Sequence, residues 1–282
     1  MQPRRIFPSA VSPWWIATSL AFVVCLQSGC SLQKMTVRQT ADVLWEGQIA
    51  LEGEKNPELA RDAFPASLKT METFLQTDPE NEKLLRMLAK GYFSYSFAFL
   101  EPDFERAEAR RAPERVIESR KESAVLTYLK ARHFALQLVD PEFRKAVLGL
   151  KADKVERMLD DMEKEDVPGI FWAAYAWGSA ANLNQSDSDL IAGLPIVEAM
   201  MKRVIELDEE FFYSGAHLFF GVYYGSRPKM YGGKPKLSKK HFEKAMEQNG
   251  HRNLMIPFLY ARFYGIQTQN RKLFDRMMNV VE

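Results

Sequence analysis

The feature that most restricts the fold of this 282-residue chain is a helical motif that recurs along it. Two of the three clearest copies begin with a large residue, and in all three a large apolar residue comes three positions after the first residue. A small residue follows directly, and the residue three positions after that is a tyrosine in two of the three. This spacing fits one face of an α-helix, and each copy is paired with a second predicted helix, which precedes the first copy and follows the other two. The clearest first-helix copies are Leu85, Leu88, Ala89 and Tyr92, then Ala174, Trp177, Gly178 and Ala181, then His217, Phe220, Gly221 and Tyr224.

The recurring residue types have a physical reason. A small residue lets two helix backbones approach closely, and the neighbouring aromatic ring fills the groove between them. No alternating pattern typical of a strand occurs after residue 36. We therefore predict an all-α fold, an array of antiparallel helix pairs of the cryptic tetratricopeptide-like kind that forms an α-α superhelix. An irregular helical bundle with chance matches is the alternative.

Proline, glycine and acidic residues mark the expected helix ends. A final hairpin is expected to begin near Pro257 and to end in a helix over 271–281. The breaks are expected at 78–81, 101–103, 140–142, 167–169 and 227–235.

The first thirty residues are typical of an export signal. Arg4 and Arg5 precede thirteen uncharged residues, 14–26, which are too few for a bilayer span of about 20 residues but fit a secretory core of about 7–15. Gln27-Ser28-Gly29-Cys30 resembles a lipoprotein cleavage site, although Gln27 stands where leucine is usual. We expect a lipoprotein signal peptide over 1–29, a helical repeat domain over 30–282, and a lipid on Cys30 that anchors the chain to a membrane.

The alternative is that residues 14–26 remain as a short anchor or a buried helix. Cleavage would remove two of the 38 basic residues and none of the 37 acidic ones, so the mature net charge would be −1. It would also remove Cys25, leaving no second cysteine for a disulfide. Ser31 after Cys30 slightly favours the outer membrane as the one that carries the anchor.

The charged and nucleophilic residues give no support for catalysis, a cofactor or a metal. The near-equal charge balance excludes a basic field for nucleic acid. The four histidines have no pair at the spacing of a helical zinc site, and the glycines at 232–233 lack the remainder of a phosphate-binding loop. The mixed-charge run over 103–122 is interpreted as a solvated face, or as a rim that docks a partner protein.

Aromatic side chains are the better indication of function. They gather in three predicted first helices, where an array with a concave side can present them as an apolar wall with a few hydroxyl groups. Tyr95 and Tyr223 fall off the expected core stripe, and ordinary packing is the alternative for each single residue. We predict that the chain binds a hydrophobic small molecule. The predicted ligand-binding residues are Tyr95, Trp177, Tyr223, Tyr224, Tyr231 and Tyr260.

Several segments resemble a known family, the T component of tripartite ATP-independent periplasmic (TRAP) transporters. Upstream segments are similar to its middle motifs, and the resemblance covers roughly residues 40–282. One departure is that the family continues with a further helix where this chain stops at Glu282, which is expected to alter a trimer contact or a cleft wall. The segments that carry the resemblance are 131–136, 171–178, 194–199, 203–208, 215–224, 230–235 and 241–246.

The resemblance implies a periplasmic lipoprotein that assembles as a homotrimer. It also implies an apolar cleft or pore that works with the solute-binding P component of the transporter. The alternative is a general tetratricopeptide scaffold lipoprotein that binds a peptide or an envelope assembly partner.

Overall fold

The computed structural model describes residues 14–226 and 233–282, with side chains from Leu32 onward apart from residue 51. These two ranges contain helices and no strand, which confirms the predicted all-α class. The elements are α1 (Trp14–Glu52), α2 (Pro57–Thr77), α3 (Glu82–Tyr95), η1 (Ser96–Leu100), α4 (Glu101–Ala109), α5 (Glu114–Ala135), α6 (Pro141–Leu148), α7 (Ala152–Leu159), η2 (Lys164–Asp166), α8 (Val167–Leu183), α9 (Ser188–Ala192), α10 (Leu194–Asp208), α11 (Phe211–Gly225), α12 (Pro235–Asn249), α13 (Met255–Tyr260), η4 (Ala261–Ile266) and α14 (Arg271–Val281).

Short polar side chains set many of the helix starts. Asn56, Asn81, Asp140, Asp187 and Asn270 each accept a hydrogen bond from a backbone N–H of the first helical turn, at 2.8–3.3 Å. These N–H groups have no partner within the helix, so a capping oxygen stabilises each start by about 1 kcal/mol. The expected breaks at 78–81 and 140–142 are confirmed, whereas the one expected at 167–169 lies earlier, at 160–163, and residues 167–169 form the first turn of α8. The break expected at 227–235 lies mostly outside the described residues.

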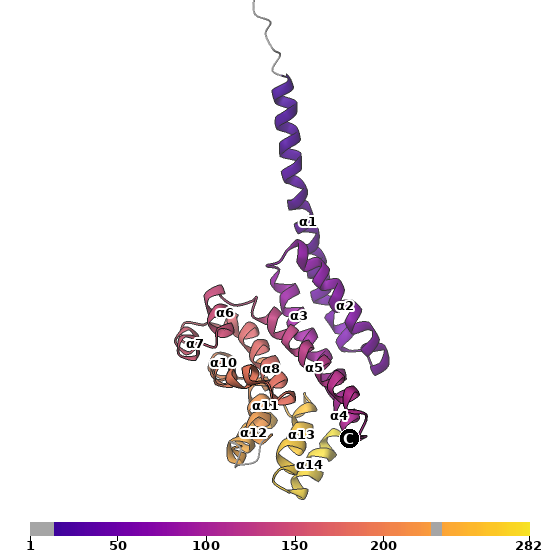
Figure 1. Cartoon of the computed structure of the whole chain (residues 1–282), viewed down its shortest axis with the longest axis vertical. Helices are drawn as coiled ribbons and strands as arrows, with labels where there is room; N and C mark the ends of the chain where they lie inside the picture. Colours follow the sequence, from indigo (N-terminus) through magenta and orange to yellow (C-terminus); the bar gives the residue numbers. More distant parts are fainter. Residues whose placement is uncertain (1–13, 227–232) are drawn as a thin grey trace, which may run out of the picture.

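The expected break at 101–103 is wrong, because α3, η1 and α4 follow one another without a loop (Figure 1). Pro102 has no backbone N–H, so inside a regular α-helix it would leave the carbonyl four residues earlier without its hydrogen bond. Here it occupies the first turn of α4, the part of a helix in which proline is common. The π-helical turn η1 directly before it absorbs the irregularity, and the chain continues in the helical direction.

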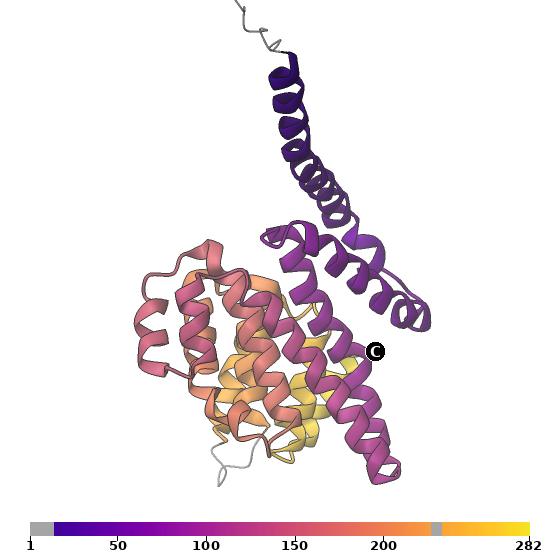
Figure 2. The same ribbon diagram turned by 45° about the horizontal axis from the view of Figure 1, so that its top comes forward.

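The helix pairs pack as the repeat motif predicts (Figures 1 and 2). The first-helix copies lie in α3, α8 and α11, which pack against α2, α10 and α12 respectively. Gly221 of α11 illustrates the close approach, since a Cβ atom there would come within 2.8 Å of the Phe242 ring of α12. Small residues at these positions therefore set the distance between helices.

The buried apolar residues form two clusters. The larger one joins α2, α3, α5, α8 and α10, and it includes Val37 and Ala41 on the part of α1 that packs against α2 and α3. The smaller one joins α12, α13, η4 and α14 around Phe242, Tyr260 and Met277. The last hairpin thus packs on α11 and α12 through this second cluster.

The array curls so that its last hairpin returns toward its first half. In Figure 1 the C-terminus and α14 lie beside α4. Arg262 of η4 forms an ion pair with Glu105 of α4, across a sequence separation of 157 residues. This return places η4 opposite α4.

A left-handed turn opens α11. Phe212, Tyr213 and Ser214 have φ values of 47°, 57° and 60°, a conformation that costs non-glycine residues of order 1 kcal/mol or more each. Buried Ser214 is held by Gln248, which accepts from its hydroxyl at 2.7 Å, and by Asn249, which donates to it at 2.7 Å. The packing of α12 therefore maintains this turn.

Two histidines that lie far apart in the sequence meet beside this turn. The Nδ1 atoms of His217 and His241 lie 2.8 Å apart, and His217 Nε2 lies 3.0 Å from a carboxylate oxygen of Glu209. Burial and the neighbouring His217 lower the pKa of His241 to about 4, so its ring is neutral at neutral pH. No group of three His, Cys, Asp or Glu within the described ranges is placed to hold a metal ion.

None of the helices that the structure describes is long and apolar enough to cross a membrane. The backbone of α1 runs through residue 30, but the side chain of Cys30 is outside the described part, as are residues 1–13 with Arg4 and Arg5. The predicted signal peptide and lipid attachment therefore stay predictions.

We predict that the effect on stability of a substitution at Gly193, at the start of α10, depends on whether Trp177 of α8 is present. Trp177 is 2% exposed, and a Cβ atom at residue 193 would fall 1.7 Å from its ring. Trp177→Ala should reduce the free energy of unfolding by about 3–5 kcal/mol, because it empties a packed site. Gly193→Ala should cost about 1–3 kcal/mol, because it overfills the same site.

Chemical denaturation of the two single variants and the double variant checks this dependence. In the Trp177→Ala background, Gly193→Ala should cost less than about 1 kcal/mol, because the ring that it meets is gone. Additive costs would mean that the two residues do not share one packing site.

Candidate functional site

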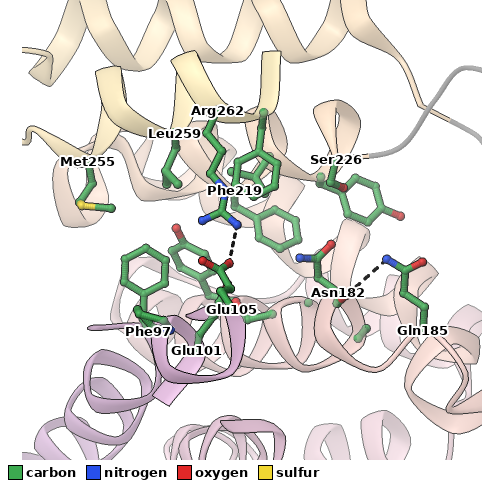
Figure 3. Close-up of a pocket in the computed structure, with 18 of the residues that line it drawn as sticks. Phe97, Glu101, Glu105, Asn182, Gln185, Phe219, Ser226, Met255, Leu259 and Arg262 are labelled. Atoms are coloured by element: carbon green, nitrogen blue, oxygen red, sulfur yellow. Dashed lines mark hydrogen bonds and ion pairs between the residues drawn. The ribbon is translucent and has the colours of Figure 1, made fainter. Parts of the chain in front are cut away.

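The space left by the curl of the array is a cleft of about 840 Å³ (Figure 3). One wall is made by η1 and α4, the floor by α8, and the opposite wall by α11, α13 and η4, with contributions from α9 and α10. The volume lies in the range of about 300–1,000 Å³ that is usual for small-molecule sites. It forms between segments that are distant in the sequence.

Apolar side chains dominate the walls of the cleft. Phe219 of α11 packs edge-on against Tyr175 of α8 at 5.7 Å between ring centroids, and it stacks on Tyr223 at 5.5 Å. Gly178 of α8 permits this position of Phe219, since a Cβ atom there would lie 2.5 Å from the ring. The aromatic lining residues are Phe97, Tyr175, Phe219, Tyr223, Phe258 and Phe263.

Two π-helical segments lie on facing walls of the cleft. In η1 the backbone N–H of Glu101 bonds to the carbonyl of Ser96, one residue further than in an α-helix. The Ser96 hydroxyl donates to the carbonyl of Ala124 at 2.9 Å, which ties the turn to α5. On the opposite wall, η4 carries Arg262 and Phe263. Such π-helical turns are frequent at functional sites, where the extra residue redirects side chains.

Charged groups lie in the middle of the cleft. Glu101 and Glu105 are four residues apart and therefore share one face of α4, while Arg262 approaches Glu105 from η4 (Figure 3). The Tyr128 hydroxyl of α5 donates to a carboxylate oxygen of Glu101. Burial raises the pKa of Glu101 to about 7; the Tyr128 hydrogen bond opposes this, the charge of Glu105 adds to it and that of Arg262 opposes it.

Uncharged polar groups lie at one end of the cleft. Figure 3 places Asn182, Gln185 and Ser226 at this end and Met255 at the other, with the Glu105–Arg262 ion pair between them. The cleft thus offers a molecule apolar walls, a charged middle and an amide-rich end. No catalytic arrangement of a nucleophile and a base is found among these described lining residues.

The structure brings one of the six predicted ligand-binding residues into the cleft. Tyr223 lines it, and the ring is half-buried. Tyr95, the other residue that was expected off the core stripe, is also half-buried but stacks on Phe64 of α2, away from the cleft lining. Tyr231 lies outside the described residues.

The other three predicted residues are buried in helix packing. Trp177 donates from its ring N–H to the carbonyl of Leu190 at 3.2 Å, and the Tyr224 hydroxyl donates to Glu198 at 3.1 Å. Tyr260 is 2% exposed and stacks on Phe242 of α12. None of the three lines the cleft, because each fills a repeat core position instead.

Sequence reasoning missed the charged residues of the cleft. Glu105 belongs to the run over 103–122 that was interpreted as a solvated face or a docking rim. Two acids of this run instead form ion pairs with residues outside it, Asp103 with Arg61 of α2 and Glu105 with Arg262. The spacing of Glu101 and Glu105 was visible, but nothing local in the sequence indicated that η4 would face them.

Comparison with known families confirms the resemblance found in the sequence. The model of the family described as TRAP transporter T-component (TAtT) matches residues 53–282. No curated protein matches the chain.

Proposed function

Because the chain belongs to the TRAP transporter T-component family, we propose that it is a periplasmic lipoprotein that binds an apolar small ligand in the cleft. The family is a transport accessory and not an enzyme family. In this proposal the chain holds the ligand and exchanges it with the transporter's solute-binding P component. The homotrimer is proposed from the family resemblance.

The single observation that carries the proposal is the cleft itself. Its volume of about 840 Å³ and its aromatic lining suit a molecule with a large apolar part, because burying apolar surface contributes roughly 25 cal/mol per Å². The cleft is built from helices of both packing clusters, so a bound molecule would contact both parts of the array.

The anchor is proposed from the sequence of the first thirty residues. Cleavage before Cys30 would remove residues 14–29 of α1, and a lipid on Cys30 would attach the remainder of that helix to a membrane, with the outer membrane slightly favoured by Ser31. The part of α1 that packs on α2 and α3 would then connect the anchor to the helical array.

Filling the cleft tests the ligand role. Ala98 of η1 lines the cleft and is exposed, so Ala98→Trp adds a large ring there without disturbing buried packing. We expect this variant to lower the affinity for the apolar fluorescent probe N-phenyl-1-naphthylamine about tenfold or more, because it removes volume and contact area. Fluorescence titration of the purified chain measures it.

Ala66→Trp, at an exposed position of α2 outside the cleft, is the matched control and should bind as the unmodified chain does. Equal affinities of all three proteins would place the probe elsewhere and count against the ligand role.

Cys30→Ser should stop labelling of the chain by radioactive palmitate in growing cells, because it removes the thiol to which the lipid is attached. The circular dichroism spectrum should stay that of a helical protein, since the packed clusters lie after residue 36. Continued labelling would mean that the anchor lies at another residue.

The partner role is tested by sedimentation velocity of the purified chain with the solute-binding protein of its own transporter. A faster-sedimenting species that contains both proteins is expected. Separate sedimentation of the two proteins at concentrations of about 50 µM would contradict the partner role, since this corresponds to a binding free energy weaker than about −6 kcal/mol.

A further inference from the structure

The charges that face the cleft are unbalanced. Among the described lining residues the charged ones are Glu101, Glu105 and Arg262. Arg262 is paired with Glu105, and no described cation forms an ion pair with Glu101, whose hydrogen-bond partner is the neutral hydroxyl of Tyr128. The cleft therefore carries one excess negative charge when Glu101 is ionised.

Aromatic rings surround this excess charge. Phe97 lies beside Glu101 in Figure 3. Tyr175 of α8 lines the same cleft. The negative faces of aromatic rings attract cations by about 0.5–2 kcal/mol each when water is excluded. A carboxylate among such rings is an arrangement that favours a positively charged group of a ligand.

We propose that the ligand of the cleft is an amphiphile with a cationic head, an amine or a quaternary ammonium, which lies beside Glu101 while the apolar part lies along the aromatic walls. This inference rests on the proposed ligand role and adds the chemical class of the ligand. Its head would supply the cation that Glu101 lacks.

An anionic head fits the same geometry less well. It would need Arg262, which would then have to leave Glu105, and the head would lie close to two carboxylates on one face of α4. A neutral head would leave the charge of Glu101 without a partner. Only a cationic head gives ionised Glu101 a partner without breaking the ion pair of Glu105 and Arg262.

The protonation of Glu101 gives the proposal a pH signature. Four groups face Glu101: Glu105 on its own helix, Tyr128 of α5, Tyr175 of α8 and Arg262 of η4. The pKa of about 7 in the free cleft means that ionised Glu101 is mostly present at pH 8 and mostly absent at pH 6. A cationic head binds the ionised form, so its affinity should rise about tenfold from pH 6 to pH 8.

The test compares three probes with the same hexyl chain on the purified full chain: hexyltrimethylammonium, hexanol and hexanoate. Isothermal titration calorimetry at pH 6 and pH 8 gives the affinities. We expect hexyltrimethylammonium to bind most tightly at pH 8, and its affinity to fall about tenfold at pH 6. Hexanol should bind equally at both values.

Two variants test whether the preference for the cationic probe and its pH dependence arise at Glu101. Glu101→Gln keeps an acceptor oxygen for Tyr128 but removes the charge, so it should abolish both the preference for the cation and its pH dependence. Glu108→Gln removes an exposed carboxylate of the same helix and should change neither. Circular dichroism confirms that both variants are folded, and Ala98→Trp should weaken all binding that occurs in the cleft.

The outcomes separate this inference from the proposed ligand role. Equal binding of the three probes, lost in Ala98→Trp and unaffected by Glu101→Gln, would overturn the cationic head and support the ligand role. Tightest binding of hexanoate would also overturn it and assign the head to Arg262. Absence of binding by every probe would contradict the ligand role and the inference together.

Discussion

The close approach of helices at small residues is the constraint on which the rest of this structure depends. Gly221 faces the ring of Phe242, Gly178 faces Phe219, and Gly193 faces Trp177, so in each case a glycine of one helix, or at its start, admits an aromatic ring of another helix. A larger residue at any of these positions would push two helices apart by more than a packed core tolerates. The distances between pairs, and through them the curl of the array, follow from these contacts.

The curl of the array creates the cleft, and irregular helical turns carry several of the side chains that line it. The last hairpin packs on α11 and α12 through the smaller apolar cluster, and it meets the first half of the chain at Phe97 and at the pair of Arg262 and Glu105. The π-helical turns η1 and η4 carry the chain on either side of the opening, and the former places Glu101 at the start of α4. Packing thus explains the walls, and backbone irregularity explains which polar groups face the interior.

The fold could be predicted because its signals are local. The spacing of Leu88, Ala89 and Tyr92 identifies a helix and its buried face from one stretch of sequence, and the capping residues mark many of its ends. Pro102 misled the prediction because a proline looks like a break, whereas the π-helical turn before it lets the helical run continue.

The cleft could be predicted only in part, because its walls meet through contacts across more than 150 residues. Tyr223 was identified as lying off the core stripe, and it does line the cleft; Trp177, Tyr224 and Tyr260 occupy core positions whose residue types look the same in sequence. Glu101 carries no pattern that distinguishes it from a solvated acid. Its surroundings in the cleft depend on Tyr128 and Arg262, which only the folded chain brings near it.

The most direct measurement of the central claim, that the cleft holds a small molecule, is native mass spectrometry of the chain purified gently from its own cells. The account predicts a protein that carries an added mass of a few hundred daltons, an amount that a cleft of about 840 Å³ accommodates, and that loses it on mild activation. Protein that carries no added mass, or that carries a peptide of a thousand daltons or more, which the cleft is too small to enclose, would contradict it.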